Sequence, residues 1–319
     1  MKKIRAAVIG VGYLGRFHAQ KYAALGDCEL VAVVDAEAQV AARVAAELGV
    51  RALNDHRELY GLVDAVSVAT PTQSHAEIAA GFLRAGAHVL VEKPITETGE
   101  QAQALIDLAR QHSLVLQVGH LERFKPAILA AEPLLTTARF IECVRLAPFK
   151  ERGTEVNVVL DLMIHDIDLI QMIVACPVAA LEAVGTPVFS GEIDIANARL
   201  RFDNGCVANV TASRVSLKTE RKLRVFRDDA YLSIDLHQKI LTVIRKRATP
   251  PGAGELPVQI EEQSFEQGDA LLAEIQAFLA AIRGQRPVIV SGEDGQRALR
   301  TAIAISERVR AAPAEPARV

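Results

Sequence analysis

The chain has 319 residues, which is enough for two domains with full hydrophobic cores. Half of the residues are hydrophobic and the net charge is −3, so the composition excludes a disordered protein and a general basic surface for nucleic acid. No apolar run is long enough to cross a bilayer, and the N-terminus does not fit a signal peptide. The cysteines are scattered and form no C-x-x-C pair, which predicts reduced thiols in a cytoplasm and no zinc cluster; they are Cys28, Cys143, Cys176 and Cys206.

The N-terminal stretch predicts a dinucleotide-binding turn. A short apolar run over 6–9 ends at Gly10, and Gly12 and Gly15 complete the spacing G-x-G-x-x-G before a helical pattern begins. Gly10 lets the chain turn sharply, Gly12 lets a pyrophosphate approach the backbone, and Gly15 lets the helix pack closely. The N-terminus of the helix then offers N–H groups and the positive end of its dipole to the phosphates.

A second apolar run, over 30–34, ends in an acidic residue that fits the same site. Asp35 lies 20 residues after Gly15, where a carboxylate accepts hydrogen bonds from the hydroxyls of an adenosine ribose. An acid there repels a 2′-phosphate and no arginine follows it directly, so NAD is favoured over NADP as the cofactor. The alternative is an ordinary β-α-β unit in which Asp35 only ends a strand.

Helix and strand patterns alternate through the first part of the chain. Such alternation with short links predicts a doubly wound parallel sheet, whose ligands lie at the carboxyl ends of the strands. Gly10, Asp35, Thr70 and Lys93 fall at those ends and are expected to line one crevice. The predicted helices cover 37–48, 75–85 and 100–112, and the predicted strands cover 65–69, 88–92 and 115–118.

After Gly119 the pattern changes to strands without intervening helices, which predicts an α+β domain with a large, mostly antiparallel open sheet. One face of an open sheet of that size needs a cover, so a homo-oligomer, dimer or tetramer, is expected. The fold class is therefore α/β, with a dinucleotide-binding domain over 1–120, an α+β domain over 121–310 and a disordered tail over 311–319. The predicted strands cover 139–147, 181–186, 196–202, 206–213, 222–226, 231–235, 240–245 and 258–265, and the predicted helices cover 123–132, 158–175, 269–283 and 292–310.

Three groups of residues could carry chemistry. The sequence Glu92-Lys93-Pro94 places a lysine at a strand end, although most lysines are simply solvated. Asp161 and His165 are four residues apart on an apolar helix, so both lie on one face, and a histidine beside an acid can take the proton of an alcohol as hydride leaves. A buried structural histidine is the alternative.

The third group is Thr70-Pro71-Thr72 with His75. Hydroxyl groups at a strand end can bind a ribose or a phosphate, and a helix cap followed by a turn is the equally weighted alternative. Direct metal catalysis is not expected, because no histidine and carboxylate residues have the spacing of metal ligands apart from Asp161, His165 and Asp166.

In this order, G-V-G-Y-L-G, A-T-P-T-Q-S-H, V-L-V-E-K-P and L-D-L-M-I-H-D-I-D resemble the Gfo/Idh/MocA oxidoreductase family along essentially the whole chain. The resemblance implies a Rossmann domain, an open-sheet domain and NAD(P)-dependent oxidation of a sugar or cyclitol hydroxyl. It implies a catalytic set of Lys93, Asp161 and His165, with His165 as the base. It also implies a cofactor pocket of Gly10, Gly12, Tyr13, Leu14, Gly15, Asp35, Thr70, Pro71, His75, Glu92 and Lys93.

Three further segments, G-H-L-E-R-F-K-P, I-H-D-I-D and T-A-S-R-V-S, resemble a narrower group of bacterial dehydrogenases that oxidise the 3-hydroxyl of UDP-N-acetylglucosamine. An aminotransferase then aminates the ketone for lipid A, so a nucleotide-sugar substrate is expected. Arg214 could meet a diphosphate, and His120 and Arg123 could contact the substrate, although Arg123 could instead pair with an acid. The alternatives are a dehydrogenase of a free sugar or inositol, and an NAD-binding regulator without turnover.

Overall fold

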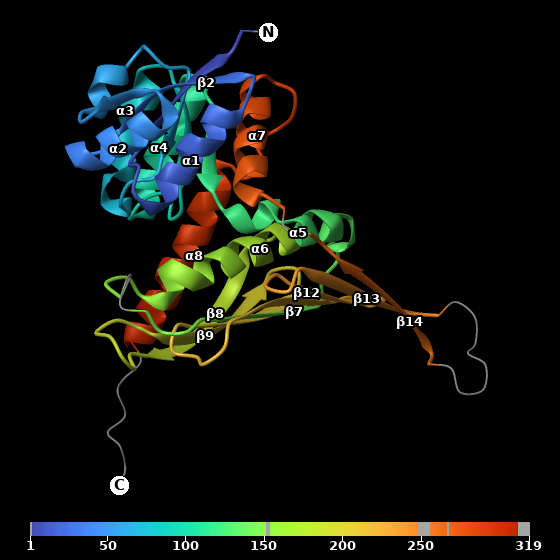
Figure 1. The fold of residues 1–319 in the computed structure, drawn as a ribbon. Coiled ribbons are helices and arrows are strands. Elements are labelled where there is room, and N and C mark those ends of the chain that lie inside the picture. Colours follow the sequence, from blue (N-terminus) through green and yellow to red (C-terminus); the bar gives the residue numbers. More distant parts are fainter. Residues whose placement is uncertain (1, 151–153, 248–255, 267, 312–319) are drawn as a thin grey trace. The chain divides into compact units, whose positions relative to one another are not determined.

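The computed structural model describes residues 2–150, 154–247, 256–266 and 268–311. The chain divides into two compact units: Met1–Phe124 with Asp269–Leu299, and Lys125–Gly268 with Arg300–Val319 (Figure 1). This division differs from the predicted boundary at residue 120, because a late helix and the start of the last one return to the first unit. Of the predicted disordered tail, residues 312–319 lie outside the described residues.

The first unit is built on a six-stranded parallel sheet with the order β3-β2-β1-β4-β5-β6. The strands are short apolar runs whose side chains are mostly buried, as expected for a parallel sheet with helices packed on it. The predicted Rossmann sheet is therefore confirmed. Its elements are β1 (Ile4–Ile9), α1 (Tyr13–Ala24), β2 (Cys28–Val34), α2 (Ala38–Leu48), β3 (Arg51–Leu53), β4 (Ala65–Val68), α3 (His75–Arg84), β5 (His88–Glu92), α4 (Gly99–Gln111) and β6 (Leu116–Gly119).

Helix α7 (Ala270–Ile282) completes the core of the first unit, although it lies far along the chain. Asp269 caps the helix by accepting a hydrogen bond from the backbone N–H of Leu272 at 2.9 Å. Leu271, Ile275 and Phe278 recur on one face of the helix and are buried in the same cluster as the side chains of β1 and α1.

The second unit is built on an eight-stranded sheet with the order β14-β13-β12-β11-β7-β10-β9-β8 (Figure 1). All neighbouring pairs are antiparallel except β7 and β10, which run parallel, so the prediction of a large, mostly antiparallel sheet is confirmed. Helices α5 (Pro126–Ala131) and α6 (Ile164–Val174) pack on the sheet. The strands are β7 (Phe140–Leu146), β8 (Val178–Thr186), β9 (Ile195–Phe202), β10 (Val207–Ser213), β11 (Glu220–Phe226), β12 (Ala230–Asp235), β13 (Ile240–Lys246) and β14 (Val258–Ser264).

The last helix, α8 (Gly292–Ala311), contributes residues to both units. No helix in the described part of the chain is long and apolar enough to cross a membrane.

Two predicted helices have a different internal structure. The segment predicted as one helix over 158–175 begins as a π-helix, Val159–Met163, and continues as α6. The segment predicted over 123–132 is split into a 3₁₀ turn, Leu121–Phe124, and α5, because Pro126 lacks an N–H and starts a new helix at its first turn.

Candidate active site

The glycine turn has the geometry that a dinucleotide site requires. Gly10 follows β1 with a φ of +82°, and a Cβ there would lie 2.8 Å from the backbone nitrogen of Thr70. A Cβ on Gly15 would lie 1.8 Å from the carbonyl oxygen of Gly10, so the helix needs glycine to approach the turn. A Cβ on Gly12 would have no described atom within 4 Å, which leaves open space at the N-cap of α1. A pyrophosphate fits at this position, where helix N–H groups face outward.

Asp35 directly follows β2 and already organises the glycine turn. One carboxylate oxygen accepts from the backbone N–H of Val11 at 2.9 Å, and the other accepts from the N–H of Glu37 at 3.0 Å. Each carboxylate oxygen has two lone pairs, so both can still accept a ribose hydroxyl. The carboxylate therefore joins the turn to the predicted ribose position.

The remaining strand-end residues of the first unit lie along the same edge of the sheet. Because β2, β1, β4 and β5 are adjacent in that order, Asp35, Gly10, Thr70 and Lys93 follow one another along their carboxyl ends. The strand order reverses between β1 and β4, and ligands of doubly wound sheets bind at such a switch point. Gly10 and Thr70 flank it.

His75 ties two of these strand-end loops together. The side chain is buried, with its Nδ1 2.9 Å from the carbonyl oxygen of Pro94 and its Nε2 2.8 Å from the carbonyl oxygen of Thr70. Carbonyl oxygens only accept, so the ring donates from the nitrogen that carries the hydrogen. His75 thus connects the Thr70 loop to the Lys93–Pro94 peptide, whose bond is cis.

Asp161 and His165 lie in the second unit, where the π-helical segment passes into α6. Both side chains are partly exposed, whereas Met163 and Ile164 between them are fully buried. Asn157 begins this segment by accepting from the N–H groups of Val159 and Leu160, both at 3.0 Å. π-helical turns inside α-helices are frequent at functional sites. Lys93 belongs to the other unit, so its meeting with this pair stays a prediction.

Not every acid of this helix has the same role. Asp166 is buried and receives two hydrogen bonds from the guanidinium of Arg145, from Nε and Nη2 at 2.8 Å each. Such a bidentate pair fixes α6 on β7. The acid next to His165 is therefore structural, and Asp161 remains as the acid on the partly exposed face.

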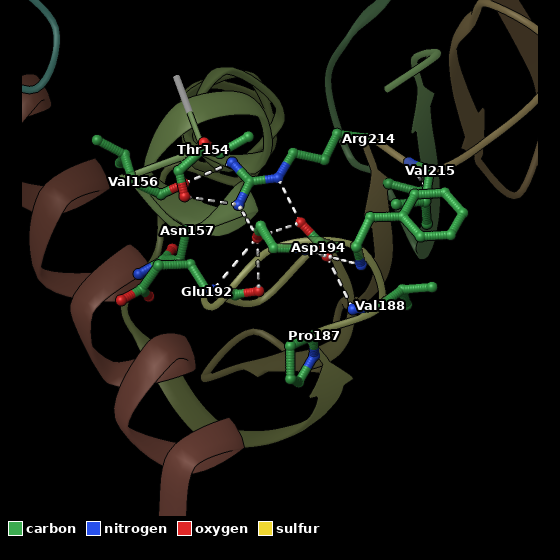
Figure 2. A network of polar contacts seen from close by, with 12 residues as sticks. Thr154, Val156, Asn157, Pro187, Val188, Glu192, Asp194, Arg214 and Val215 are labelled. Carbon is green, nitrogen blue, oxygen red and sulfur yellow. Dashed lines mark hydrogen bonds and ion pairs between the residues drawn. The ribbon is translucent and has the colours of Figure 1, made fainter. Parts of the chain in front are cut away.

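Arg214 is buried and holds the loop before the π-helix (Figure 2). Its Nε donates to Asp194 at 2.7 Å, its Nη1 donates to the carbonyl oxygen of Val156, and its Nη2 donates to the hydroxyl of Ser190 at 3.1 Å. Of these partners, Ser190 also lines an open cavity of about 590 Å³, together with Phe149, Thr154, Glu155, Phe189, Gly191 and Glu192. The contact of Arg214 with a diphosphate stays a prediction.

Asp194 is fully buried and ionised in this network (Figure 2). Burial opposes its charge, but hydrogen bonds from the hydroxyl and N–H of Ser190, from Arg214 and from the N–H of Val188 hold the pKa of the Asp194 carboxyl well below its usual range. Sequence reasoning did not single out this residue, since a single aspartate before a strand is common.

The two other predicted substrate residues are buried in the first unit. Arg123 donates to the carbonyl oxygen of Ile289 at 3.2 Å and lies 3.6 Å from a carboxylate oxygen of Asp294, so the alternative of pairing with an acid is seen. His120 directly follows β6 and is also buried. Three basic residues that follow β10 form ion pairs as well: Lys218 with Glu220, Lys222 with Asp235 and Arg224 with Glu142.

Strand, glycine turn, helix and strand-end acid together define a dinucleotide-binding domain of an oxidoreductase. Comparison with known families agrees: the family described as "Oxidoreductase family, NAD-binding Rossmann fold" matches residues 4–120, and "GFO/IDH/MocA C-terminal domain" matches residues 144–233. The chain belongs to the Gfo/Idh/MocA oxidoreductase family, and its first unit is an NAD-binding Rossmann domain.

Similar proteins include a UDP-N-acetylglucosamine 3-dehydrogenase from Acidithiobacillus ferrooxidans, which is 42% identical over 98% of this chain and 99% of its own. A solved structure of that dehydrogenase superimposes with a TM-score of 0.92, over 98% of this chain and 99% of that one. An inositol 2-dehydrogenase from Rhizobium meliloti is 26% identical over 93% of this chain and 94% of its own.

Proposed function

We propose that this protein is an NAD-dependent dehydrogenase that oxidises the 3-hydroxyl of UDP-N-acetylglucosamine to a ketone. The observation that carries the proposal is the 42% identity, over nearly the full length of both chains, to a dehydrogenase of that name. The inositol dehydrogenase is similar over the same length but much less identical, which favours the nucleotide sugar over a cyclitol.

In the proposed reaction His165 takes the proton of the substrate hydroxyl, and Asp161, on the same face of the helix, stabilises the positive charge that the ring gains. Lys93 holds the hydroxyl in position at the end of β5. NAD, when bound, would supply the hydride acceptor for the carbon that carries this hydroxyl. Gly12 and the N-terminus of α1 would hold its pyrophosphate, and Asp35 would accept from the ribose.

The direct test is to incubate the protein with NAD and a panel of UDP-sugars, free sugars and inositols, and to follow the absorbance of reduced nicotinamide. We expect reduction with UDP-N-acetylglucosamine and little with myo-inositol. Lys93→Met should abolish reduction but leave NAD binding intact, whereas Lys246→Met, at an exposed lysine of β13, should change neither. Unchanged turnover in Lys93→Met would remove this residue from the mechanism.

A binding test separates the alternatives that activity leaves open. UDP at 100 times its Kd should stabilise the protein by about 2.7 kcal/mol, measured as a shift in melting temperature. A shift without any NADH production would favour a cofactor-binding regulator, and no shift would favour a free sugar or inositol as substrate.

We further propose that the reaction takes place in the cytoplasm and supplies an aminotransferase in lipid A biosynthesis. The ketone is the functional group that an aminotransferase converts to an amine, and the scattered free cysteines fit a reducing compartment. Adding such an aminotransferase with its amino donor should increase the yield of NADH, because it removes the ketone.

We also propose a homo-oligomer in which a second copy covers the sheet of the second unit. One partly exposed apolar row crosses neighbouring strands on a single face, since its members are paired in register from β10 to β14. The row consists of Val207, Phe140, Phe226, Tyr231, Ile244 and Ile260, and the ring centroids of Phe226 and Tyr231 lie 4.8 Å apart. Exposed apolar surface of this kind marks interfaces.

Tyr231→Glu places a charge in the middle of this row. We expect it to lower the mass measured by light scattering to that of the monomer, because burying an unpaired carboxylate in an apolar interface is costly. Gln111→Glu, which adds the same charge at an exposed position of α4, should leave the mass unchanged. A wild-type mass equal to that of the single chain would contradict the proposal.

A further inference from the structure

A chain of buried polar side chains in the first unit leads to the carboxyl group of Glu92, the residue before Lys93. The Tyr22 phenol lies 2.9 Å from the Ser67 hydroxyl, Ser67 lies 3.2 Å from Nδ1 of His18, and Nε2 of His18 lies 2.9 Å from Oε1 of Glu92. A fifth side chain, Glu274 of α7, completes this Glu92–Glu274 cluster: its carboxyl lies within 4.8 Å of the ligand atoms of both His18 and Glu92.

The hydrogen bonds in this chain have one direction that satisfies every donor. Tyr22 is fully buried, and Ser67 is the hydrogen-bond partner of its phenol among the described residues, so the phenol donates to Ser67. Ser67 then donates its single hydrogen to Nδ1 of His18, and the ring donates from Nε2 to Glu92. The reverse direction would leave the phenol hydrogen buried without an acceptor, so Glu92 is the acceptor at the end of the chain.

Glu274 lacks the donors that an ionised carboxylate needs. Its side chain is fully buried, and neither carboxyl oxygen has a hydrogen-bond partner among the described residues. Burial raises the pKa of this carboxyl well above its usual range, and the charge of Glu92 raises it further. Two neutral groups lie near this chain: the amide of Gln117, which donates to the backbone oxygen of Glu274, and, near Tyr22, the thiol of Cys28, whose pKa burial raises to about 12.

We propose that Glu274 is held as a neutral carboxylic acid and donates its hydrogen to the carboxylate of Glu92, so that the two carboxyl groups together carry one negative charge. A small side-chain rotation brings the two carboxyl groups into hydrogen-bond distance, since one oxygen of Glu274 already lies within 4.8 Å of one oxygen of Glu92. This arrangement gives the Glu274 hydroxyl an acceptor and avoids a second buried charge.

A divalent metal ion is the other occupant that a histidine and two carboxyl groups could hold. It would need the lone pair of His18 Nε2, because Nδ1 faces Ser67. The hydroxyl chain places a hydrogen on Nε2, so the cluster favours a proton over a metal ion.

The shared proton gives Glu274 a positioning role, an inference that rests on the proposed function. The Glu92 carboxylate accepts from the backbone N–H of Lys93 at 3.3 Å, and it lies against Gly119 of β6, where a Cβ would come within 2.8 Å of its carboxyl atoms. A second negative charge would push Glu92 away from this place. The neutral acid on α7 therefore keeps the peptide of Lys93 where the strand ends.

Infrared difference spectroscopy on the full chain at neutral pH tests the proton directly. Glu274→Gln should lose the C=O stretch of a protonated carboxyl group, whereas Glu97→Gln, at an exposed carboxyl of the same unit, should not. If no such band is lost, or if the purified protein holds a stoichiometric divalent metal that Glu274→Gln releases, the proposal is overturned.

Steady-state kinetics tests the positioning role. Glutamine can still donate an N–H to Glu92, so Glu274→Gln should keep the wild-type kcat. Glu274→Met fills similar space without a donor and should lower kcat by about tenfold at an unchanged KM for NAD, since a hydrogen bond to a charged group is lost. Equal kcat values for the two variants would refute the role. The infrared result needs no substrate, so an inactive protein with the band present would count against the proposed function alone.

Discussion

Two fully buried carboxyl groups, Asp194 in the second unit and Glu274 in the first, respond to burial in opposite ways. Asp194 meets the Arg214 guanidinium and several N–H donors, and its pKa is lowered although burial opposes the charge. Glu274 meets another carboxyl group, and both its burial and the charge of Glu92 raise its pKa. The surrounding donors, more than the depth of burial, therefore decide whether an acid inside this protein keeps its charge.

The largest expected change in stability comes from breaking the ion pair between Arg214 and Asp194. Arg214→Met leaves the charge of Asp194 buried without its cation, and we expect it to lower the free energy of unfolding by about 3–5 kcal/mol. Urea denaturation measures the change. Arg199→Met, at an exposed arginine of β9, should cost no more than about 0.5 kcal/mol. A loss below about 1 kcal/mol for Arg214→Met would show that the loop that donates its N–H groups to Asp194 is stable without the ion pair.

A smaller loss of stability is expected in the first unit, where the hydrogen-bonded chain leads to Glu92 beside Glu274. Ser67→Ala removes the acceptor of the Tyr22 phenol and the donor to His18, so we expect a loss of about 1–3 kcal/mol in the free energy of unfolding. Tyr22→Phe removes only the first donor of the chain and should cost about 1 kcal/mol or less. If Tyr22→Phe costs more than Ser67→Ala, the direction assigned to the hydrogen bonds is wrong.

The smallest effect is a slope of stability against pH. A carboxyl whose pKa is raised by folding binds its proton more tightly in the folded state, so its contribution is complete below the unfolded pKa and is lost as the pH rises. Above about pH 5, each pH unit should therefore cost the wild type up to about 1.4 kcal/mol that Glu274→Gln does not lose.

Asp194 gives the opposite sign, because its pKa is lowered by folding. Its contribution is present above the unfolded pKa and is lost as the solution is made acidic, so Asp194→Asn should flatten the fall of stability below about pH 4. Urea midpoints measured across this range check both slopes. Parallel curves for the wild type and Glu274→Gln would show that Glu274 titrates alike in the folded and unfolded chain.

Much of the fold could be predicted because its signals are local. The predicted strand over 88–92 coincides with β5, and the predicted helix over 37–48 differs from α2 by one residue. The short strand β3 was missed, since its three residues are too few to show a periodicity. The π-helical turn was missed for a different reason: it keeps an apolar helical pattern and differs only in its backbone hydrogen bonds.

The residues of the candidate site also differ in how far the sequence could predict them. Gly10, Gly12, Gly15 and Asp35 follow a spacing that backbone geometry imposes, and the structure gives each a matching environment. Glu274 and Asp194 could not be found in this way, because their environment is made by residues distant in the sequence. Even Arg214, which the sequence singled out, lies in a network that depends on Asp194 and the loop before the π-helix.

The position of α7 has a consequence for how the protein must be synthesised. Leu271, Ile275 and Phe278 supply part of the core around α1, yet the ribosome makes them more than a hundred residues after the parallel sheet. Until they emerge from the ribosome, the nascent chain contains a dinucleotide-binding sheet whose apolar surface beside α1 is uncovered. An N-terminal fragment that ends near residue 124 would leave this apolar surface exposed permanently. Proteolysis or a premature stop codon would therefore release an incomplete, aggregation-prone domain instead of a working NAD-binding domain.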